Sequence, residues 1–411
     1  MPDANADVVV VGAGVIGTAI AAELAPDHEV LVLDKEAPGG EASSLAAGLV
    51  APTLFMHQEP EAAVHANQFF RSFSGTGEFE FSERRRVEIV SPEDADEARR
   101  QAATMDSTGF PVSFLDAAAL EDSHQAFDLA GFGGAIEIAD AGFVDDPYVY
   151  VRALAADAER NGAEIRDGVE VTGIRTQGDA VVGVRTDTGN IDAPNVVVAA
   201  GWRTRELVSA DVDLPVRPFL LQSLTIDPPT RLGDDFPLGR LPAEEVYFRP
   251  QRDGNLRLGG GEFFIDDAES RTRGVAEMAS DGGTSRTFQE TADTNDASDR
   301  FIDHVADVVP TFLRGIDDPE AVRFVETWEG VGSANPDTSP ILDTPAALDG
   351  LVVAAGFNGL GITKSPVAAA AVRALVTGET APFSLQPYAL ETRPTSSLEF
   401  TLQDTFAMGR E

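Results

Sequence analysis

Residues 8–36 read VVVVGAGVIGTAIAAELAPDHEVLVLDKE, and this stretch decides the fold. An apolar run enters the pattern Gly-x-Gly-x-x-Gly at Gly12, Gly14 and Gly17. An alanine-rich stretch with helical character follows, and a second apolar run ends at Asp34. The order of these parts predicts a strand, a tight turn, a helix and a second strand that ends in an acid.

Each part of this pattern suits the binding of an adenine dinucleotide. The glycines permit a tight turn, close approach of the backbone to a pyrophosphate and close packing of the helix on the strand. The helix directs its free N–H groups and the positive end of its dipole at the phosphates. The carboxylate of Asp34 can accept hydrogen bonds from ribose hydroxyls. The stretch therefore predicts a Rossmann-like unit for NAD or FAD.

The composition is strongly acidic. The 411 residues include 69 Asp and Glu against 30 Lys and Arg, which gives a net charge of −39, and the lysines are Lys35 and Lys364. Self-repulsion of this kind is screened at molar salt, where the Debye length is about 3 Å. We therefore expect a cytoplasmic protein of a halophilic, salt-accumulating organism. The lack of a basic patch predicts no nucleic-acid partner.

The cysteine and histidine content excludes several kinds of site. The chain has no cysteine, which excludes a disulfide, an iron–sulfur cluster and a cysteinyl flavin link. Its five histidines show no metal-ligand spacing, so we expect no metal site. There is no cleavable leader and no apolar run of about 18 residues, so we expect no membrane insertion.

Segments of α/β character flank segments rich in β-strands. Apolar runs at 195–201 and 351–356 predict buried strands, and residues 216–265 alternate with period two, as antiparallel strands do. We expect an α/β fold in which a discontinuous Rossmann-like FAD- or NAD-binding domain carries an inserted α+β substrate domain built on an antiparallel sheet. The predicted segments are 1–85, 144–215 and 321–385 for the nucleotide domain, 86–143 and 216–320 for the substrate domain (with an acidic loop at 266–299), and 386–411 for a C-terminal tail.

Five separated stretches resemble a single family. Besides the fingerprint, they are residues 42–52, 198–202, 246–250 and 356–366. In this order they resemble the D-amino-acid oxidase, glycine oxidase and sarcosine oxidase family of FAD-dependent oxidoreductases. The resemblance implies that the dinucleotide is FAD. Relatives with covalently bound flavin have a histidine where this chain has Leu45, so FAD is expected to be noncovalent.

The resemblance also implies which residues hold FAD. The fingerprint would face the pyrophosphate, Asp34 and Lys35 the adenosine ribose, and Val171 the adenine. Residues 43–49 would line the ribityl chain and ring. The second glycine-rich turn would present N–H groups and the dipole of a helix starting near Ser365 to the flavin's pyrimidine edge; a plain strand-to-helix loop is the alternative. The predicted FAD-binding residues are Gly12, Gly14, Val15, Ile16, Gly17, Asp34, Lys35, Ser43, Ser44, Ala47, Gly48, Leu49, Val171, Gly201, Gly356, Phe357, Asn358, Gly359, Leu360, Gly361, Ile362 and Thr363.

The substrate side departs from the family pattern. Glycine oxidases have an arginine after a late Trp-x-Gly that pairs with the substrate carboxylate, and here its place falls near Gly332. A carboxylate without a cationic partner would be desolvated at a cost of several kcal/mol. The predicted substrate-binding residues are Tyr247, Arg249, Trp328 and Lys364. The alternatives are a strand tyrosine satisfied within the protein, a core tryptophan and a solvated lysine.

The predicted reaction is oxidation of a C–N bond in a small amine or amino acid of the glycine, sarcosine or D-amino-acid type. A hydride would pass to flavin N5, and no catalytic acid or base is assigned, because the flavin carries the chemistry. The acceptor would be O2 or an electron carrier. Two alternatives stay open: an FAD-dependent 2-hydroxyacid or polyol dehydrogenase, and a non-catalytic flavin-binding subunit of a larger complex.

Overall fold

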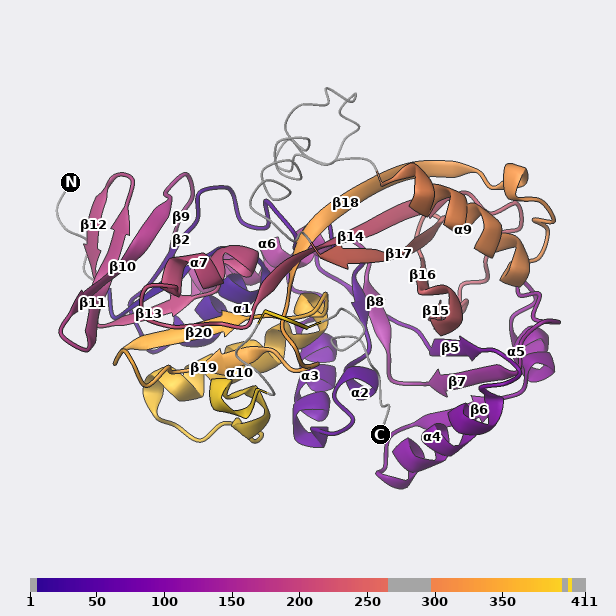
Figure 1. The fold of residues 1–411 in the computed structure, drawn as a ribbon, viewed down its shortest axis with the longest axis horizontal. Helices are drawn as coiled ribbons and strands as arrows, with labels where there is room; N and C mark the ends of the chain where they lie inside the picture. Colours follow the sequence, from indigo (N-terminus) through magenta and orange to yellow (C-terminus); the bar gives the residue numbers. More distant parts are fainter. Residues whose placement is uncertain (1–5, 265–296, 394–397, 401–411) are drawn as a thin grey trace.

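The computed structural model describes residues 6–264, 297–393 and 398–400. Two bodies lie side by side, one around a six-stranded sheet and the other around an eight-stranded sheet (Figure 1). This arrangement confirms the predicted α/β class. The acidic loop predicted at 266–299 lies outside the described residues except for 297–299, and the predicted tail is described only at 386–393 and 398–400.

The six-stranded sheet contains the fingerprint. Its order is β19 (Ile341–Asp343), β20 (Leu351–Ala355), β13 (Asn195–Val198), β1 (Val8–Val11), β2 (Val30–Leu33) and β9 (Glu164–Arg166). Neighbouring strands are parallel except for β19 and β20. The sequences of β1 and β2, VVVV and VLVL, are buried on both faces. Continuous apolar runs are typical of parallel strands that are covered on both sides.

Each face of this sheet has its own cover. On one face pack α1 (Val15–Leu24), α6 (Pro147–Arg160) and α10 (Gly361–Thr377), with α2 (Pro52–Phe55) and α3 (Pro60–Phe73) beyond them. On the other face lie α7 (Thr204–Val208) and the antiparallel strands β10 (Val171–Gln177), β11 (Ala180–Thr186) and β12 (Gly189–Asp192). None of the helices in the described ranges combines the length and apolar character needed to cross a lipid bilayer.

The eight-stranded sheet is almost wholly antiparallel. Its order is β18 (Phe324–Ala334), β14 (Arg217–Ile226), β17 (Leu256–Phe264), β16 (Val246–Pro250), β15 (Leu238–Leu241), β5 (Arg86–Val90), β7 (Gly134–Ile138) and β6 (Val112–Leu115), and only β5 and β15 run parallel. Helices α4 (Ala95–Ser107) and α5 (Ala117–Ser123) flank β6 and β7. A small sheet of β3 (Leu49–Val50), β8 (Gly142–Val144) and β4 (Phe81–Glu83) includes β8, which lies between the two bodies (Figure 1).

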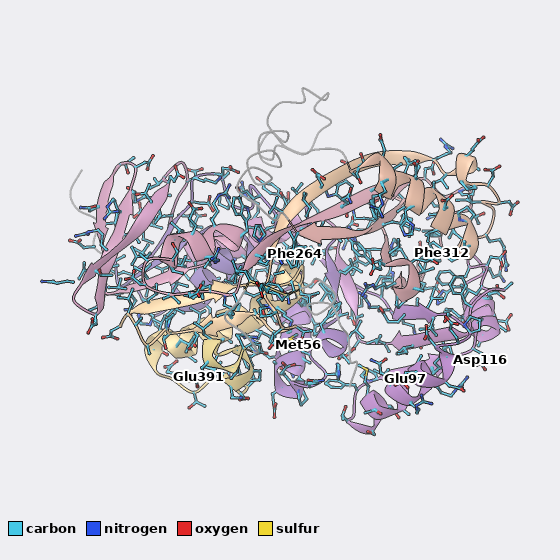
Figure 2. All side chains as sticks on the ribbon, in the orientation of Figure 1. Met56, Glu97, Asp116, Phe264, Phe312 and Glu391 are labelled. Carbon is cyan, nitrogen blue, oxygen red and sulfur yellow. The ribbon has the colours of Figure 1, made fainter. Side chains whose placement is uncertain are left out.

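Alternation along these strands separates an apolar face from a polar one. In β16, Val246 and Phe248 enter a core that also contains Phe312 of α9 (Asp299–Phe312), on the right of the molecule (Figure 2). The intervening Tyr247 and Arg249 point to the opposite face, because successive strand residues alternate sides. That second face contacts the body with the six-stranded sheet, since Arg249 donates a hydrogen bond to the Ala47 carbonyl.

Two details of the sequence prediction were wrong. Residues 324–334, placed within the nucleotide segment 321–385, form β18 and pair with β14 in the eight-stranded sheet. Without this neighbour one edge of β14 would leave its N–H and C=O groups unpaired. The second helix begins at Gly361 rather than near Ser365. Pro366 is tolerated inside it because the Ser365 hydroxyl donates to the Ile362 carbonyl, which proline has no N–H to reach.

Candidate active site

A cavity of about 820 Å³ runs along the fingerprint. Its shape depends on glycine: a Cβ on Gly17 would lie 1.8 Å from the Gly12 carbonyl oxygen. Gly12 itself has φ +105°, and a Cβ there would lie 2.5 Å from the Ala199 oxygen. The turn and the start of α1 therefore approach the sheet more closely than any other residue would allow. This cradle fits a pyrophosphate at the N-terminus of α1.

The acid at the end of β2 lies on the wall of the same cavity. The Asp34 carboxylate accepts hydrogen bonds from the N–H groups of Ala13 (2.6 Å) and Glu36 (2.9 Å). Burial raises the pKa of Asp34 above its usual value, and those two hydrogen bonds oppose the rise. The neighbouring Lys35 is paired with Glu36 and Glu41. Asp34 is thus held rigidly where a ribose can meet it.

A second cavity, of about 250 Å³, lies where the two bodies meet. It shares Val15, Ser43 and Phe357 with the first cavity, so the two are contiguous. Its walls come from residues 41–49, from the turn at 357–362, from residues 330–333 of β18 and from the polar face of the eight-stranded sheet. The arrangement places a nucleotide-binding channel beside a smaller chamber with charged side chains.

The second glycine turn is held by an asparagine pair. Asn358 has φ +52°, and its side-chain oxygen accepts from the Asn335 N–H at 2.8 Å. Its amide nitrogen donates to the Asp337 carbonyl, and Asn335 donates to the Gly356 carbonyl. These bonds tie the turn to the end of β18 and direct the N-terminus of α10 at the chamber. The positive end of the helix dipole there favours negative charge in the chamber.

Five polar side chains line the chamber from the sheet: Arg86, Ser223, Arg240, Tyr247 and Ser333. Arg240 of β15 lies opposite Tyr247 of β16 in the strand register. The Tyr247 hydroxyl lies 3.1 Å from the Ser223 hydroxyl. A Cβ on Gly259 would lie 2.0 Å from the Tyr247 oxygen, so the ring lies across that glycine.

The two arginines differ in their partners. Arg86 is buried, and its Nε donates to Glu88 at 2.6 Å, which neutralises its charge. Arg240 is half-buried and has neither an ion pair nor a side-chain hydrogen bond to any residue that the structure describes. A cation in this state attracts an anionic ligand, because part of its hydration has been lost without replacement.

A family profile described as DAO, FAD dependent oxidoreductase, matches residues 7–375. The chain belongs to the DAO family. It is 28% identical over 370 residues to 4-methylaminobutanoate oxidase (formaldehyde-forming) of Paenarthrobacter nicotinovorans. The aligned region covers 87% of this chain and 42% of that protein. It is 26% identical over 405 residues to a glycine oxidase of Pseudomonas putida, across 94% of this chain and 98% of the relative.

The fold agrees with this assignment. The crystal structure of glycine oxidase from Geobacillus kaustophilus matches with a TM-score of 0.77 at 24% sequence identity, covering 95% of this chain and 100% of that one. This DAO-family chain is therefore an enzyme, an oxidoreductase, and FAD is its cofactor. The predictions of family, enzyme class and cofactor are confirmed.

The residues predicted to hold FAD lie mostly on the two cavity walls. Those that line them are Gly12, Gly14, Val15, Ile16, Asp34, Lys35, Ser43, Ala47, Gly48, Leu49, Val171, Gly201, Phe357, Asn358, Gly359, Leu360, Gly361 and Ile362. The others support the walls: Gly17 packs on Gly12, Ser44 donates to the Glu41 carbonyl, Gly356 packs on Asn335 and Thr363 donates to the Leu49 carbonyl. Which of them contact FAD stays a prediction.

Only one of the four predicted substrate-binding residues lines the chamber of this DAO-family chain. Tyr247 lines the chamber, but Arg249, Trp328 and Lys364 do not. Arg249 is fully buried and pairs with Asp145 at 2.9 Å. The Trp328 indole donates to the Leu45 carbonyl at 3.0 Å, and the buried Lys364 donates to the Thr338 carbonyl at 2.7 Å. All three side chains therefore bind partners within the protein rather than facing the chamber.

The sequence prediction missed Arg86 and Arg240. A signal for Arg240 was present, because a hairpin that turns at 242–245 places it opposite Tyr247. No comparable signal existed for Arg86, which reaches the chamber because β5, distant in the sequence, pairs with β15.

Proposed function

We propose that this enzyme oxidises the C–N bond of a small amine that carries a carboxylate, of the glycine, sarcosine or 4-methylaminobutanoate kind. The observation that carries the proposal is Arg240, a cation without a partner among the described residues, in the chamber beside the second glycine turn. A charge-assisted hydrogen bond from a guanidinium to a carboxylate is among the stronger contacts that a site offers a small ligand. The names of the relatives agree with such a substrate.

The chain's own residues would orient the substrate. Arg240 would hold the carboxylate, with the hydroxyls of Tyr247 and Ser223 beside it on the same face of the sheet. The amine-bearing carbon would then lie against the wall formed by residues 45–49. FAD, when bound, supplies the hydride acceptor. Orientation and exclusion of water are then the main contributions left to the protein.

The residues present fit FAD on grounds of the structure alone. The glycine cradle at Gly12 and Gly17 admits a pyrophosphate, and Asp34 is held for a ribose. The channel and the chamber are contiguous, as an extended dinucleotide requires. The absence of cysteine and the leucine at residue 45 favour noncovalent binding. Either O2 or an electron carrier is a suitable acceptor, and the acidic composition favours a salt-rich cytoplasm.

Anaerobic reduction of the flavin by a matched substrate panel tests the proposal. The panel pairs glycine, sarcosine and 4-methylaminobutanoate with glycolate, lactate and methylamine, and follows loss of the flavin's visible absorbance. Bleaching by a carboxylated amine, with little by methylamine, is expected. Bleaching by the hydroxy acids alone would instead identify a 2-hydroxyacid dehydrogenase. No bleaching, together with co-purification of a second chain, would favour a subunit of a larger complex.

A further inference from the structure

Five consecutive backbone carbonyls, in residues 45–49, each accept a hydrogen bond. Three donors are side chains from the polar face of the eight-stranded sheet and one is the Thr363 hydroxyl of α10. The donors are Trp328 Nε1 to Leu45 (3.0 Å), Arg257 Nη1 to Ala46 (3.5 Å), Arg249 Nε to Ala47 (2.6 Å), the Val144 N–H to Gly48 (2.8 Å) and Thr363 Oγ1 to Leu49 (2.9 Å). Residues 45–48 make no hydrogen bonds of a helix or a β-sheet ladder, so these donors from other elements hold the segment in place.

The carbonyl contacts determine where the N–H groups point. In a trans peptide the C=O of one residue and the N–H of the next point in opposite directions. The N–H groups of Ala46, Ala47 and Gly48 therefore point away from the sheet donors. Within the described ranges these three N–H groups have no hydrogen-bond acceptor. All three residues line the chamber beside the second glycine turn, so a row of donors faces a ligand there.

Two buried charges stand behind this row. Arg249 and Arg257 are register partners on β16 and β17, and they are 0% and 3% exposed. Arg249 is balanced by Asp145 at 2.9 Å. Arg257 has no ion pair within the described part of the chain, its Nε has no acceptor there, and its guanidinium lies 4.6 Å from the centre of the Trp328 ring.

Such a charge is costly to bury unless negative charge lies near it. Burial lowers the pKa of Arg257, with nearby Glu326 opposing the shift, and burial together with the adjacent Arg257 charge lowers the pKa of Arg249 to about 9. A guanidinium stays protonated in proteins. Through the Ala46 and Ala47 carbonyls these charges polarise the peptide groups whose N–H groups face the chamber. Donors of this kind stabilise negative charge that develops on a bound group.

We propose that Trp328, Arg257 and Arg249 are positioning residues that clamp the carbonyls of residues 45–47. The clamp presents the Ala46, Ala47 and Gly48 N–H groups to the flavin, and the Arg257 charge, which has no direct ion pair in the described residues, makes the site favour negative charge on that flavin. The inference concerns the cofactor and is independent of which substrate the chamber takes. It also explains why three charged or aromatic side chains that do not line the chamber occupy its supporting wall.

The test separates the geometry of the clamp from its charge. Trp328→Phe keeps the ring beneath Arg257 but removes the donor to Leu45. Arg257→Gln keeps donors without charge, whereas Arg257→Lys keeps charge. Thr225→Val is the matched control, because Thr225 is buried beside Arg257 in the strand register and its hydroxyl has no partner in the described residues. The readouts are the Kd for FAD by fluorescence, the flavin's visible spectrum and the Kd for sulfite, which adds to flavin N5 more tightly where the site favours negative charge.

Trp328→Phe is expected to raise the Kd for FAD about fivefold, as loss of one net hydrogen bond does. Arg257→Gln is expected to raise the sulfite Kd at least tenfold, and Arg257→Lys to restore most of it, with Thr225→Val unchanged in every readout. Equal sulfite affinity in Arg257→Gln and wild type, with FAD binding intact in Trp328→Phe, would overturn the proposal. If Arg257→Gln and Arg257→Lys lost sulfite affinity equally, the part of the proposal that depends on the Arg257 charge would be overturned. Should Arg257→Gln fail to fold, Trp328→Phe and Arg257→Lys still decide the geometry.

Discussion

Arg240 of β15 lies directly opposite Tyr247 of β16, and both side chains line the chamber next to the second glycine turn. The hairpin that joins the two strands turns at Pro242–Glu244, with Glu245 in the left-handed region at φ 54°. Directly paired residues on antiparallel strands share a face of the sheet, so the cation and the phenol meet one ligand together. Under the proposed function, this pair would bind the substrate carboxylate, because the glycine oxidase arginine is absent here.

Replacing Arg240 by Gln is expected to raise KM for the carboxylated amine about 10- to 100-fold, because one charge-assisted hydrogen bond of about 1.5–3 kcal/mol is lost. The effect on kcat should be smaller, since the carboxylate is bound in the ground state as well as in the transition state. Steady-state kinetics at saturating acceptor measures both. Arg240→Lys should recover part of the affinity, because it keeps the charge but not the planar fork.

The matched control for this variant is Arg323→Gln. Arg323 belongs to the same body, is 76% exposed and pairs with Asp227 at 3.2 Å. It removes the same charge without touching the chamber, so its KM should equal that of the wild type. An unchanged KM in Arg240→Gln would refute the role of Arg240 in substrate binding. Bleaching of the flavin by carboxylated amines would then still support the proposed oxidation of a C–N bond.

Gly48 offers a second prediction, on the cofactor wall. Gly48 has φ +77°, and a Cβ there would lie 2.1 Å from the Val144 carbonyl oxygen. Gly178 has the similar φ +62° but open space around it. Alanine at either site costs about 1 kcal/mol of backbone strain, and at residue 48 the clash adds about 1–3 kcal/mol. Urea unfolding should show Gly48→Ala as the less stable variant, with weaker FAD binding as well. Equal stability of the two variants would contradict this reading of the wall.

The fingerprint could be predicted because its information is local. Strand, glycines, helix and acid are consecutive, and the need for glycine at residue 17 follows from a clash with Gly12 within the same unit. The period-two pattern of residues 216–265 likewise predicted antiparallel strands, and the structure confirms them. Local pattern predicts local geometry well.

The substrate side could not be predicted in the same way. Arg249 was predicted as a cation that could replace the missing arginine of the glycine oxidases, and it does share a face of β16 with Tyr247. Here Arg249 instead passes beneath residue 47 to reach Asp145, which is distant in the sequence. Arg86 enters the chamber through the β5–β15 pairing. Such long-range pairings leave no trace in the spacing of the residues.

The acidic composition predicts that stability depends on salt. With a net charge of −39, self-repulsion in dilute buffer should be large and should fall as ions screen it. Between about 0.1 M and about 2 M KCl we expect Tm to rise by about 5–10 °C, the equivalent of a few kcal/mol. Differential scanning calorimetry measures it, with sucrose at matched osmolality as the uncharged control. A Tm that rises equally in sucrose would show that screening is not the cause.

Lys364 gives a pH-dependent prediction. Its side chain is buried in α10 and donates to the Thr338 carbonyl at 2.7 Å. Burial lowers the pKa of Lys364 from 10.5 to about 8, although Glu59 and Asp337 oppose the shift. Between pH 8 and pH 10.5 the unfolded chain therefore binds a proton that the folded chain has released. Stability rises with pH wherever the unfolded state binds more protons, so Lys364 becomes less destabilising across this window.

Comparison with Lys364→Met isolates this effect, since every other group that titrates in the window is present in both proteins. The free energy of unfolding of the wild type minus that of the variant should increase from pH 8 to pH 10.5, by up to about 3 kcal/mol at roughly 1.4 kcal/mol per pKa unit. Urea denaturation in molar KCl at several pH values measures the difference. A constant difference would mean that Lys364 keeps its ordinary pKa in the folded protein, which would require the charge to be better compensated than its single carbonyl contact allows. A decreasing difference would mean that the folded state holds the proton more tightly than the unfolded chain, through Glu59 and Asp337.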